Sequence, residues 1–129
     1  LIKKGKKICI LATGNIIVEA INSLKELNKS GIHPALVSMH TIKPIDKNFL
    51  KGIFKKFKYI VILEEHSKIG GLASAIYEVY SSSNNKNKFL SLNTGENFVE
   101  RSGKQKFAFE KLQISSKHIY KKILKFIKR

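Results

Sequence analysis

The feature that most constrains this sequence is a regular alternation of two hydrophobic periods along the chain. Short, nearly continuous apolar runs, typical of strands buried on both faces, alternate with longer segments whose apolar residues recur at helical spacing. The apolar runs occupy residues 7–13, 35–39, 59–63 and 88–92, and the helical segments occupy 17–27, 46–57, 70–80 and 115–127. This order predicts an α/β fold, a three-layer α/β/α sandwich whose mostly parallel sheet is joined by right-handed crossovers.

We expect residues 1–129 to form a single domain, because a chain of this length builds one core of ordinary size. The polar, turn-rich run over residues 81–88 predicts a loop inside that domain. Cys9 is the only cysteine, which excludes an internal disulfide and a thiolate metal cluster. Its apolar neighbours predict a buried thiol within a strand.

The formal net charge of +16 raises the question of a nucleic-acid or membrane partner. Among the 25 basic residues only Arg101 and Arg129 are arginine, the residue preferred for bidentate phosphate and base recognition. We therefore interpret the lysines as a solvated surface and expect no nucleic-acid partner. The sequence has no apolar stretch of the roughly 20 residues that span a bilayer, and its start does not resemble a secretory signal. These features predict a cytoplasmic protein without membrane attachment.

In such a fold the carboxyl ends of the strands meet at one edge of the sheet, where functional groups gather. Thr13-Gly14-Asn15 lies at a strand-to-helix turn whose backbone N–H groups could hold an anion. The turn lacks both the dinucleotide fingerprint and a phosphate-loop motif, so a tight, well-capped turn without a ligand is the favoured interpretation. In the next loop, over residues 40–46, Pro44 restricts the backbone and predicts a rigid connection that delivers Asp46 as a helix N-cap.

Residues 64–71 carry the densest group of chemical functions. Glu64 and Glu65 precede His66, and the paired Gly70 and Gly71 open the next helix. An imidazole beside a carboxylate can transfer protons near neutral pH, whereas a metal site would need more ligands than these. We favour a hydrogen-bonded corner that anchors the loop or contacts a neighbouring domain, with the glycines permitting a close approach at the helix start.

Taken in order, these segments resemble the C-terminal domain of transketolases, from about Gly5 to the last helix. The motifs are Ala12-Thr13-Gly14, Thr41-Ile42-Lys43-Pro44-Ile45-Asp46, Glu64-Glu65-His66, Gly70-Gly71-Leu72-Ala73-Ser74-Ala75 and Glu100-Arg101-Ser102-Gly103. Similar domains end the thiamine-diphosphate-dependent transketolases, the deoxyxylulose-phosphate synthases and the β subunits of 2-oxo-acid dehydrogenases. Glu-Glu-His followed by Gly-Gly-Leu looks most like transketolases, particularly bacterial ones split into two subunits, since the synthases more often show asparagine where His66 stands.

The resemblance implies a five-stranded sheet with one antiparallel edge strand, for which residues 1–4 are the candidate. It implies that thiamine diphosphate and magnesium bind to two preceding domains, the pyrophosphate and pyrimidine domains, while this domain binds no cofactor and carries no catalytic residue. Those domains, or a subunit that contains them, are the implied partners in a homodimer or heterotetramer. The candidate interface or anion-contact residues are Thr13, Gly14, Glu65, His66, Gly70 and Gly71.

The function implied is therefore structural, in an enzyme that moves a two-carbon ketol unit between sugar phosphates. The first alternative is the same domain in a 2-oxo-acid dehydrogenase β subunit or a deoxyxylulose-phosphate synthase. An alternative of another class is a free-standing module that binds an anion or nucleic acid. The coding sequence upstream of Leu1 separates these classes, because a thiamine-binding segment there supports the enzyme and a start codon directly there supports the module.

Overall fold

A four-stranded parallel sheet forms the centre of the computed structural model, which describes residues 1–96 and 104–128. Its strands are β1 (Ile8–Thr13), β2 (Ala35–Ser38), β3 (Tyr59–Glu64) and β4 (Lys88–Leu92), in the spatial order β2-β1-β3-β4. Each strand corresponds to one of the apolar runs. The register pairs Thr13 with Glu64, so the carboxyl ends of the central strands β1 and β3 lie side by side.

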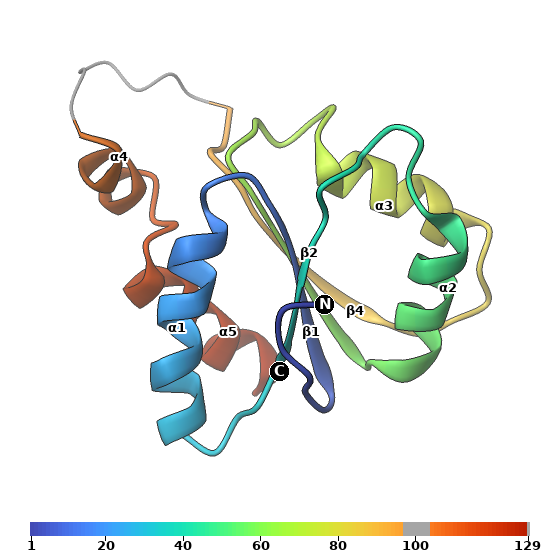
Figure 1. Cartoon of the computed structure of the whole chain (residues 1–129), viewed down its shortest axis with the longest axis horizontal. Helices are drawn as coiled ribbons and strands as arrows, with labels where there is room; N and C mark the ends of the chain where they lie inside the picture. The colour runs from blue at the N-terminus through green and yellow to red at the C-terminus, as the bar shows by residue number, and fades with distance from the viewer. Residues whose placement is uncertain (97–103, 129) are drawn as a thin grey trace.

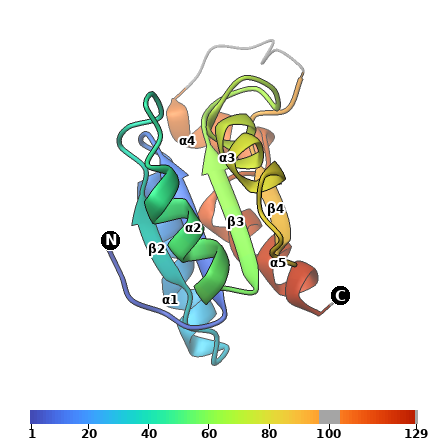
Figure 2. The same cartoon turned by 90° about the vertical axis from the view of Figure 1, so that its right-hand side faces the viewer.

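Helices cover both faces of this sheet. They are α1 (Ile17–Lys29), α2 (Lys47–Lys56), α3 (Leu72–Ser81), α4 (Gln105–Lys111) and α5 (Ser116–Ile127). Figure 1 shows α1 and α5 on one side of the sheet and α2 and α3 on the other, and Figure 2 shows α2 and α3 in front of the strands. The predicted three-layer α/β/α architecture is confirmed. The short helix α4 was not predicted.

The alternation of side chains along β1 divides the core into two layers. Ile8, Ile10 and Ala12 pack toward α1 and α5, whereas Cys9 and Leu11 pack toward α2 and α3. Complete burial of an isoleucine or leucine side chain stabilises a fold by about 1.5–3 kcal/mol. Cys9 has no exposed surface, which confirms the buried thiol, and this burial raises the pKa of the thiol to about 12.

The predicted five-stranded sheet is wrong in the described residues, because the chain start makes only one antiparallel bridge, between Lys3 and Leu36. The backbone N–H of Lys3 donates to Leu36 O at 3.1 Å, and Leu36 N donates to Lys3 O at 3.0 Å. Gly5 then crosses the start of β2 so closely that an added Cβ would overlap the backbone at Pro34 and Ala35. This crossing ends the pairing before a ladder can form.

Side chains from nearby and distant elements fix the helix starts. Asp46 is the N-cap of α2, as predicted, and its carboxylate accepts a hydrogen bond from Phe49 N at 2.9 Å. The start of α5 uses a different device. Ser115 is the N-cap residue without a side-chain cap, and Glu19 of α1 accepts from Ser116 N at 2.6 Å. A carboxylate in this position also suits the positive end of the helix dipole.

No helix in the described parts of the chain combines the length and the apolar character needed to cross a membrane. The motif Glu100-Arg101-Ser102-Gly103, on which part of the family resemblance rests, lies outside the described residues.

Candidate site at the carboxyl ends of the strands

The loops after β1 and β3 bring four of the six predicted candidate residues to one corner. Thr13 ends β1, and Gly14 follows it with a φ of 80°, a left-handed conformation that favours glycine. A Cβ added at Gly14 would lie 3.8 Å from Glu65 Oε1, in ordinary contact. Gly71 is the N-cap residue of α3 at the far end of the β3–α3 loop.

Glu64 is the buried anchor of this corner. The side chain is 1% exposed, and its carboxylate accepts hydrogen bonds from Leu72 N at 2.6 Å and Ala73 N at 3.0 Å. These bonds satisfy two of the N–H groups that a helix leaves without partners in its first turn. A hydrogen bond to a charged group contributes about 1.5–3 kcal/mol, so this pair is a strong constraint on the loop.

Gly71 makes room for the Glu64 carboxylate. A Cβ at Gly71 would overlap Glu64 Oε2 and would lie 2.8 Å from Glu64 Cδ and 3.0 Å from His66 Cγ. The backbone of Gly71, with φ of −96°, is one that other residues adopt, so the need for glycine here is steric. The predicted close approach at this helix start is therefore present, and the approaching group is the Glu64 side-chain carboxylate.

Glu65 is exposed, outside the buried cap, and its side chain connects the β3–α3 loop to α4. Its Oε2 accepts a hydrogen bond from Gln105 Nε2 at 3.0 Å, across 40 residues of sequence. The adjacent glutamates have opposite environments, since Glu64 is buried at the end of β3 and Glu65 is exposed in the loop that follows. Gln105 was not among the predicted residues, because α4 has no strong periodic pattern.

His66 and the tip of its loop are exposed. The Nδ1 atom of His66 lies 3.0 Å from Ser67 O and 3.3 Å from Ser67 Oγ, and His66 O accepts from Thr94 N at 3.0 Å. Gly70, with φ of 88°, donates its N–H to Ser74 Oγ at 2.9 Å. Between them, the Ile69 side chain is 73% exposed.

The hydrogen bonds of this corner within the described residues join backbone groups and the side chains of Ser67, Ser74 and Gln105. The ring of His66 contacts Ser67, not the carboxylate partner that would orient a general base. Within residues 1–96 and 104–128, no three His, Cys, Asp or Glu side chains gather as a metal site requires. The hydrogen bonds of the two glutamates join the β3–α3 loop to the start of α3 through Glu64 and to α4 through Glu65.

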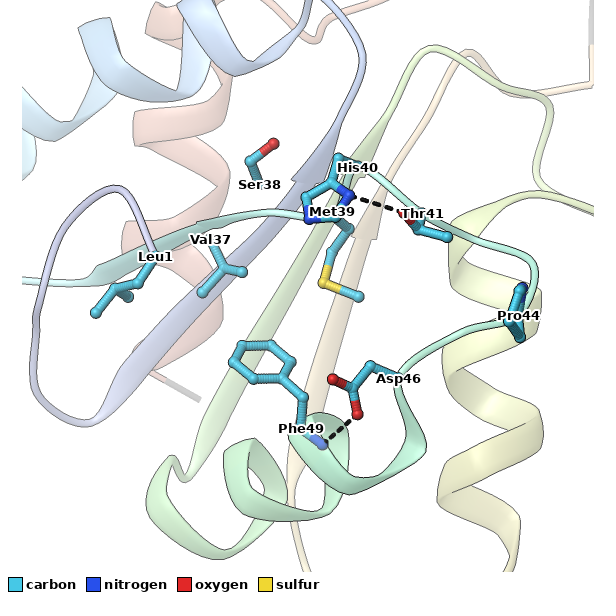
Figure 3. A pocket seen from close by; sticks show the side chains of 9 residues that line it. All are labelled: Leu1, Val37, Ser38, Met39, His40, Thr41, Pro44, Asp46 and Phe49. Atoms are coloured by element: carbon cyan, nitrogen blue, oxygen red, sulfur yellow. Dashed lines mark hydrogen bonds between the residues drawn. The ribbon is translucent and has the colours of Figure 1, made fainter.

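A separate cavity of about 200 Å³ follows the edge strand β2. His40 Nδ1 lies 2.7 Å from Thr41 Oγ1, and Asp46 is engaged with the backbone of Phe49, as Figure 3 shows. The Lys43–Pro44 peptide bond in this loop is cis. His40, Thr41 and Asp46 are thus used in local bonds, and Asp46 caps α2 as predicted.

Comparison with known proteins places the chain among transketolase-related sequences. The family model described as "Transketolase, C-terminal domain" matches residues 1–119. A transketolase C-terminal section from Methanocaldococcus jannaschii is 34% identical over 125 residues, which cover 97% of this chain and 38% of that protein. A 1-deoxy-D-xylulose-5-phosphate synthase from Haemophilus influenzae is 35% identical over 127 residues, covering 98% of this chain and 19% of the synthase.

Solved structures give the same picture of the fold. A split-gene transketolase, described as an inactive β4 tetramer, matches with a TM-score of 0.84 at 29% identity, covering 98% of this chain and 40% of that one. Transketolase from Campylobacter jejuni matches with a TM-score of 0.60 at 22% identity, which shows the fold alone, and only 17% of its chain is covered. The chain therefore spans less than half the length of each of these relatives.

Proposed function

Because the chain belongs to the transketolase C-terminal domain family, we propose that it is the assembly domain of a transketolase-like enzyme that transfers a two-carbon ketol unit between sugar phosphates. The section from Methanocaldococcus jannaschii is matched over only 38% of its length, so that relative has further segments which this chain does not match. The proposed partners are the pyrophosphate and pyrimidine domains, or a subunit that carries them. The proposed assembly is a homodimer or a heterotetramer in the cytoplasm.

The observation that carries this proposal is that the two sides of the β3–α3 loop differ. On the buried side the Glu64 carboxylate caps α3, and on the outer side His66 and the 73% exposed Ile69 face solvent. Covering the exposed Ile69 side chain with another surface would gain free energy, which makes it a candidate contact residue. Such a loop suits a neighbouring domain better than a small substrate.

Thiamine diphosphate and magnesium are proposed to bind outside this chain. The support for this proposal is that the described residues hold no cluster of three His, Cys, Asp or Glu side chains that could serve as a dedicated metal site. We expect residues 1–129 to fold alone and to show no heat of binding with thiamine diphosphate in calorimetry. Binding at micromolar concentrations would contradict the proposal.

The assembly role is tested in the full-length enzyme by replacing Ile69 with serine and His66 with alanine. Burial of most of an isoleucine side chain contributes about 1.4 kcal/mol or more, so Ile69→Ser is expected to weaken subunit association about tenfold. We expect His66→Ala to weaken association as well, while turnover per assembled enzyme stays close to the parent value. Analytical ultracentrifugation measures the first quantity and steady-state kinetics at saturating enzyme concentration measures the second.

Ile21→Ser is the matched control, because Ile21 is also an exposed isoleucine, at 40%, but lies on α1. It should leave association unchanged. If His66→Ala instead abolishes turnover in fully assembled enzyme, His66 acts in the reaction and the assembly role is wrong for this residue.

A second candidate is the corresponding domain of a 1-deoxy-D-xylulose-5-phosphate synthase. The observation that favours it is the 35% identity to the Haemophilus influenzae enzyme, as high as the identity to the transketolase section. The two are separated by assaying the full-length protein with a sugar-phosphate ketol donor and with pyruvate plus glyceraldehyde 3-phosphate. Turnover with pyruvate plus glyceraldehyde 3-phosphate, and none with the ketol donor, would favour the synthase.

A further inference from the structure

Basic side chains concentrate at the amino ends of the strands, which form the edge of the sheet opposite the candidate site. The amino ends of the strands and the carboxyl ends of the helices meet there, and cations are favoured next to the negative ends of helix dipoles. The lysines placed at this edge by their elements are Lys6, Lys7, Lys29, Lys55, Lys56, Lys58, Lys88, Lys125 and Lys128. Lys29 is paired with Glu26 at 2.9 Å. The fold thus produces an edge of positive potential from lysines that are spread along the sequence.

A cavity of about 420 Å³ opens at this edge, next to α5. Its lining includes Lys6, Lys7, Ile8, His33, Tyr59 and Ile127. This volume falls within the range of about 300–1,000 Å³ that small-molecule sites occupy. The lining comes from the chain before β1, the loop before β2, the first residue of β3 and the last turn of α5.

One wall of the cavity is apolar and firmly packed. Ile8 is 3% exposed, and Tyr59 and Ile127 pack against the core cluster on the α1 and α5 side. The Tyr59 ring lies edge-to-face with Phe126, with ring centres 5.5 Å apart and planes at 80°. Aromatic pairs of this geometry hold their rings in place, so the wall is formed before any ligand arrives.

The opposite rim is cationic, and its backbone is fixed by hydrogen bonds. Lys6 N donates to His33 O at 2.9 Å, and Tyr59 N donates to Lys7 O at 3.0 Å. His33 Nδ1 lies 2.9 Å from Asn28 Oδ1, which holds the imidazole ring at this rim. Lys58 Nζ adds a further cation 5.3 Å from the centre of the Tyr59 ring.

From this combination we propose that the cavity binds an organic phosphomonoester, a phosphate dianion carried on an aromatic or otherwise apolar body. Lys6 and Lys7 supply the charge-assisted hydrogen bonds that a phosphate accepts. The apolar wall needs a ligand body to cover it, which inorganic phosphate lacks. This inference is independent of the proposed assembly function, because it concerns the other edge of the sheet.

The test uses phenyl phosphate as the probe and calorimetric titration of the full-length protein. We expect saturable binding that is about tenfold tighter than the binding of inorganic phosphate. The double variant Lys6→Gln and Lys7→Gln should weaken phenyl phosphate binding at least about fivefold, and Lys6→Arg with Lys7→Arg should restore it. The control, Lys47→Gln with Lys51→Gln on α2, removes the same charge on the opposite face of the sheet and should leave binding unchanged.

Three outcomes would overturn the proposal. Equal affinity for inorganic phosphate would show that the apolar wall contributes nothing. Equal weakening by the α2 control would reduce the effect to general charge attraction. Unchanged binding in the Lys6→Gln and Lys7→Gln variant would place the phosphate site elsewhere. No binding of phenyl phosphate by the parent protein would show that the cavity is not such a site.

A covalent probe localises the site without relying on the variants. Pyridoxal phosphate, itself an aromatic phosphomonoester, condenses with a lysine amine to an imine with loss of water, and borohydride reduces the imine to a stable amine. Mass spectrometry should find Lys6 or Lys7 modified well before Lys47 and Lys51, with protection by phenyl phosphate. Even labelling of all exposed lysines would also overturn the proposal.

Discussion

Replacement of Gly71 by alanine tests the physical account of the candidate site most directly. The added Cβ would overlap Glu64 Oε2 and approach Glu64 Cδ to 2.8 Å. The backbone gives no relief, because α3 begins there and the Glu64 side chain is 1% exposed within the packed core. The carboxylate must therefore leave its position under Leu72 N and Ala73 N.

The expected cost follows from those two hydrogen bonds. Each is worth about 1.5 kcal/mol or more because the acceptor is a carboxylate, so their loss costs about 3 kcal/mol. The smaller conformational entropy of unfolded alanine returns about 0.4–1 kcal/mol. A net loss of about 2–3 kcal/mol should lower the urea midpoint of residues 1–129 by about 1–2 M, which circular dichroism measures.

Two further variants isolate the cause. Gly52→Ala on α2 has nothing within 4 Å of the added Cβ and should stabilise the domain by up to about 1 kcal/mol. In a Glu64→Ala background the Gly71→Ala change should cost much less, because the clashing carboxylate is gone and only the contact with His66 Cγ at 3.0 Å remains. The reasoning fails if Gly71→Ala is as harmless as Gly52→Ala, or if its cost is the same with and without Glu64.

Two other predictions concern helix capping and the buried thiol. Asp46→Ala should reduce the free energy of unfolding by about 1 kcal/mol through loss of the bond from Phe49 N, whereas Asp46→Asn should retain most of it; a full loss in both variants would show that charge, not capping, is decisive. Because burial raises the pKa of Cys9 to about 12 from 9.0, its contribution to stability is complete below pH 9 and is lost as the pH rises toward 12. A free energy of unfolding that is equal in the parent and Cys9→Ser proteins from pH 8 to 11, apart from a constant offset, would disagree with this.

The sequence was a good guide to the elements and to their order. Each apolar run became a strand because burial on both faces requires uninterrupted hydrophobicity. Asp46 could be predicted as the cap of α2 because a short acceptor side chain directly before a helical period is the usual N-cap. The role of Glu64 as the cap of α3 could not be predicted from the sequence. It depends on a bond between residues eight positions apart across a loop whose path cannot be read from periodicity.

The failures have equally local reasons. Residues 1–4 were expected to form a strand on the strength of the family resemblance, but the approach of Gly5 to the start of β2 limits the pairing to the bridge at Lys3. Helix α4, with seven residues, is too short to establish a hydrophobic period. The link from Glu65 to Gln105 depends on that helix and was missed with it.

The bond from Ser116 N to Glu19 has a consequence for how the chain is made. It joins residues 97 positions apart, and the α5 that it anchors contributes the fully buried Ile119 and Ile123 to the layer beside α1. While a ribosome is still adding residues, α1 has been synthesised but its neighbour α5 has not, so this layer stays uncovered and exposed to chaperones and proteases. A premature stop ahead of α5 would yield a chain with an open core, and quality control would meet it as an unfolded protein rather than as a slightly shortened one.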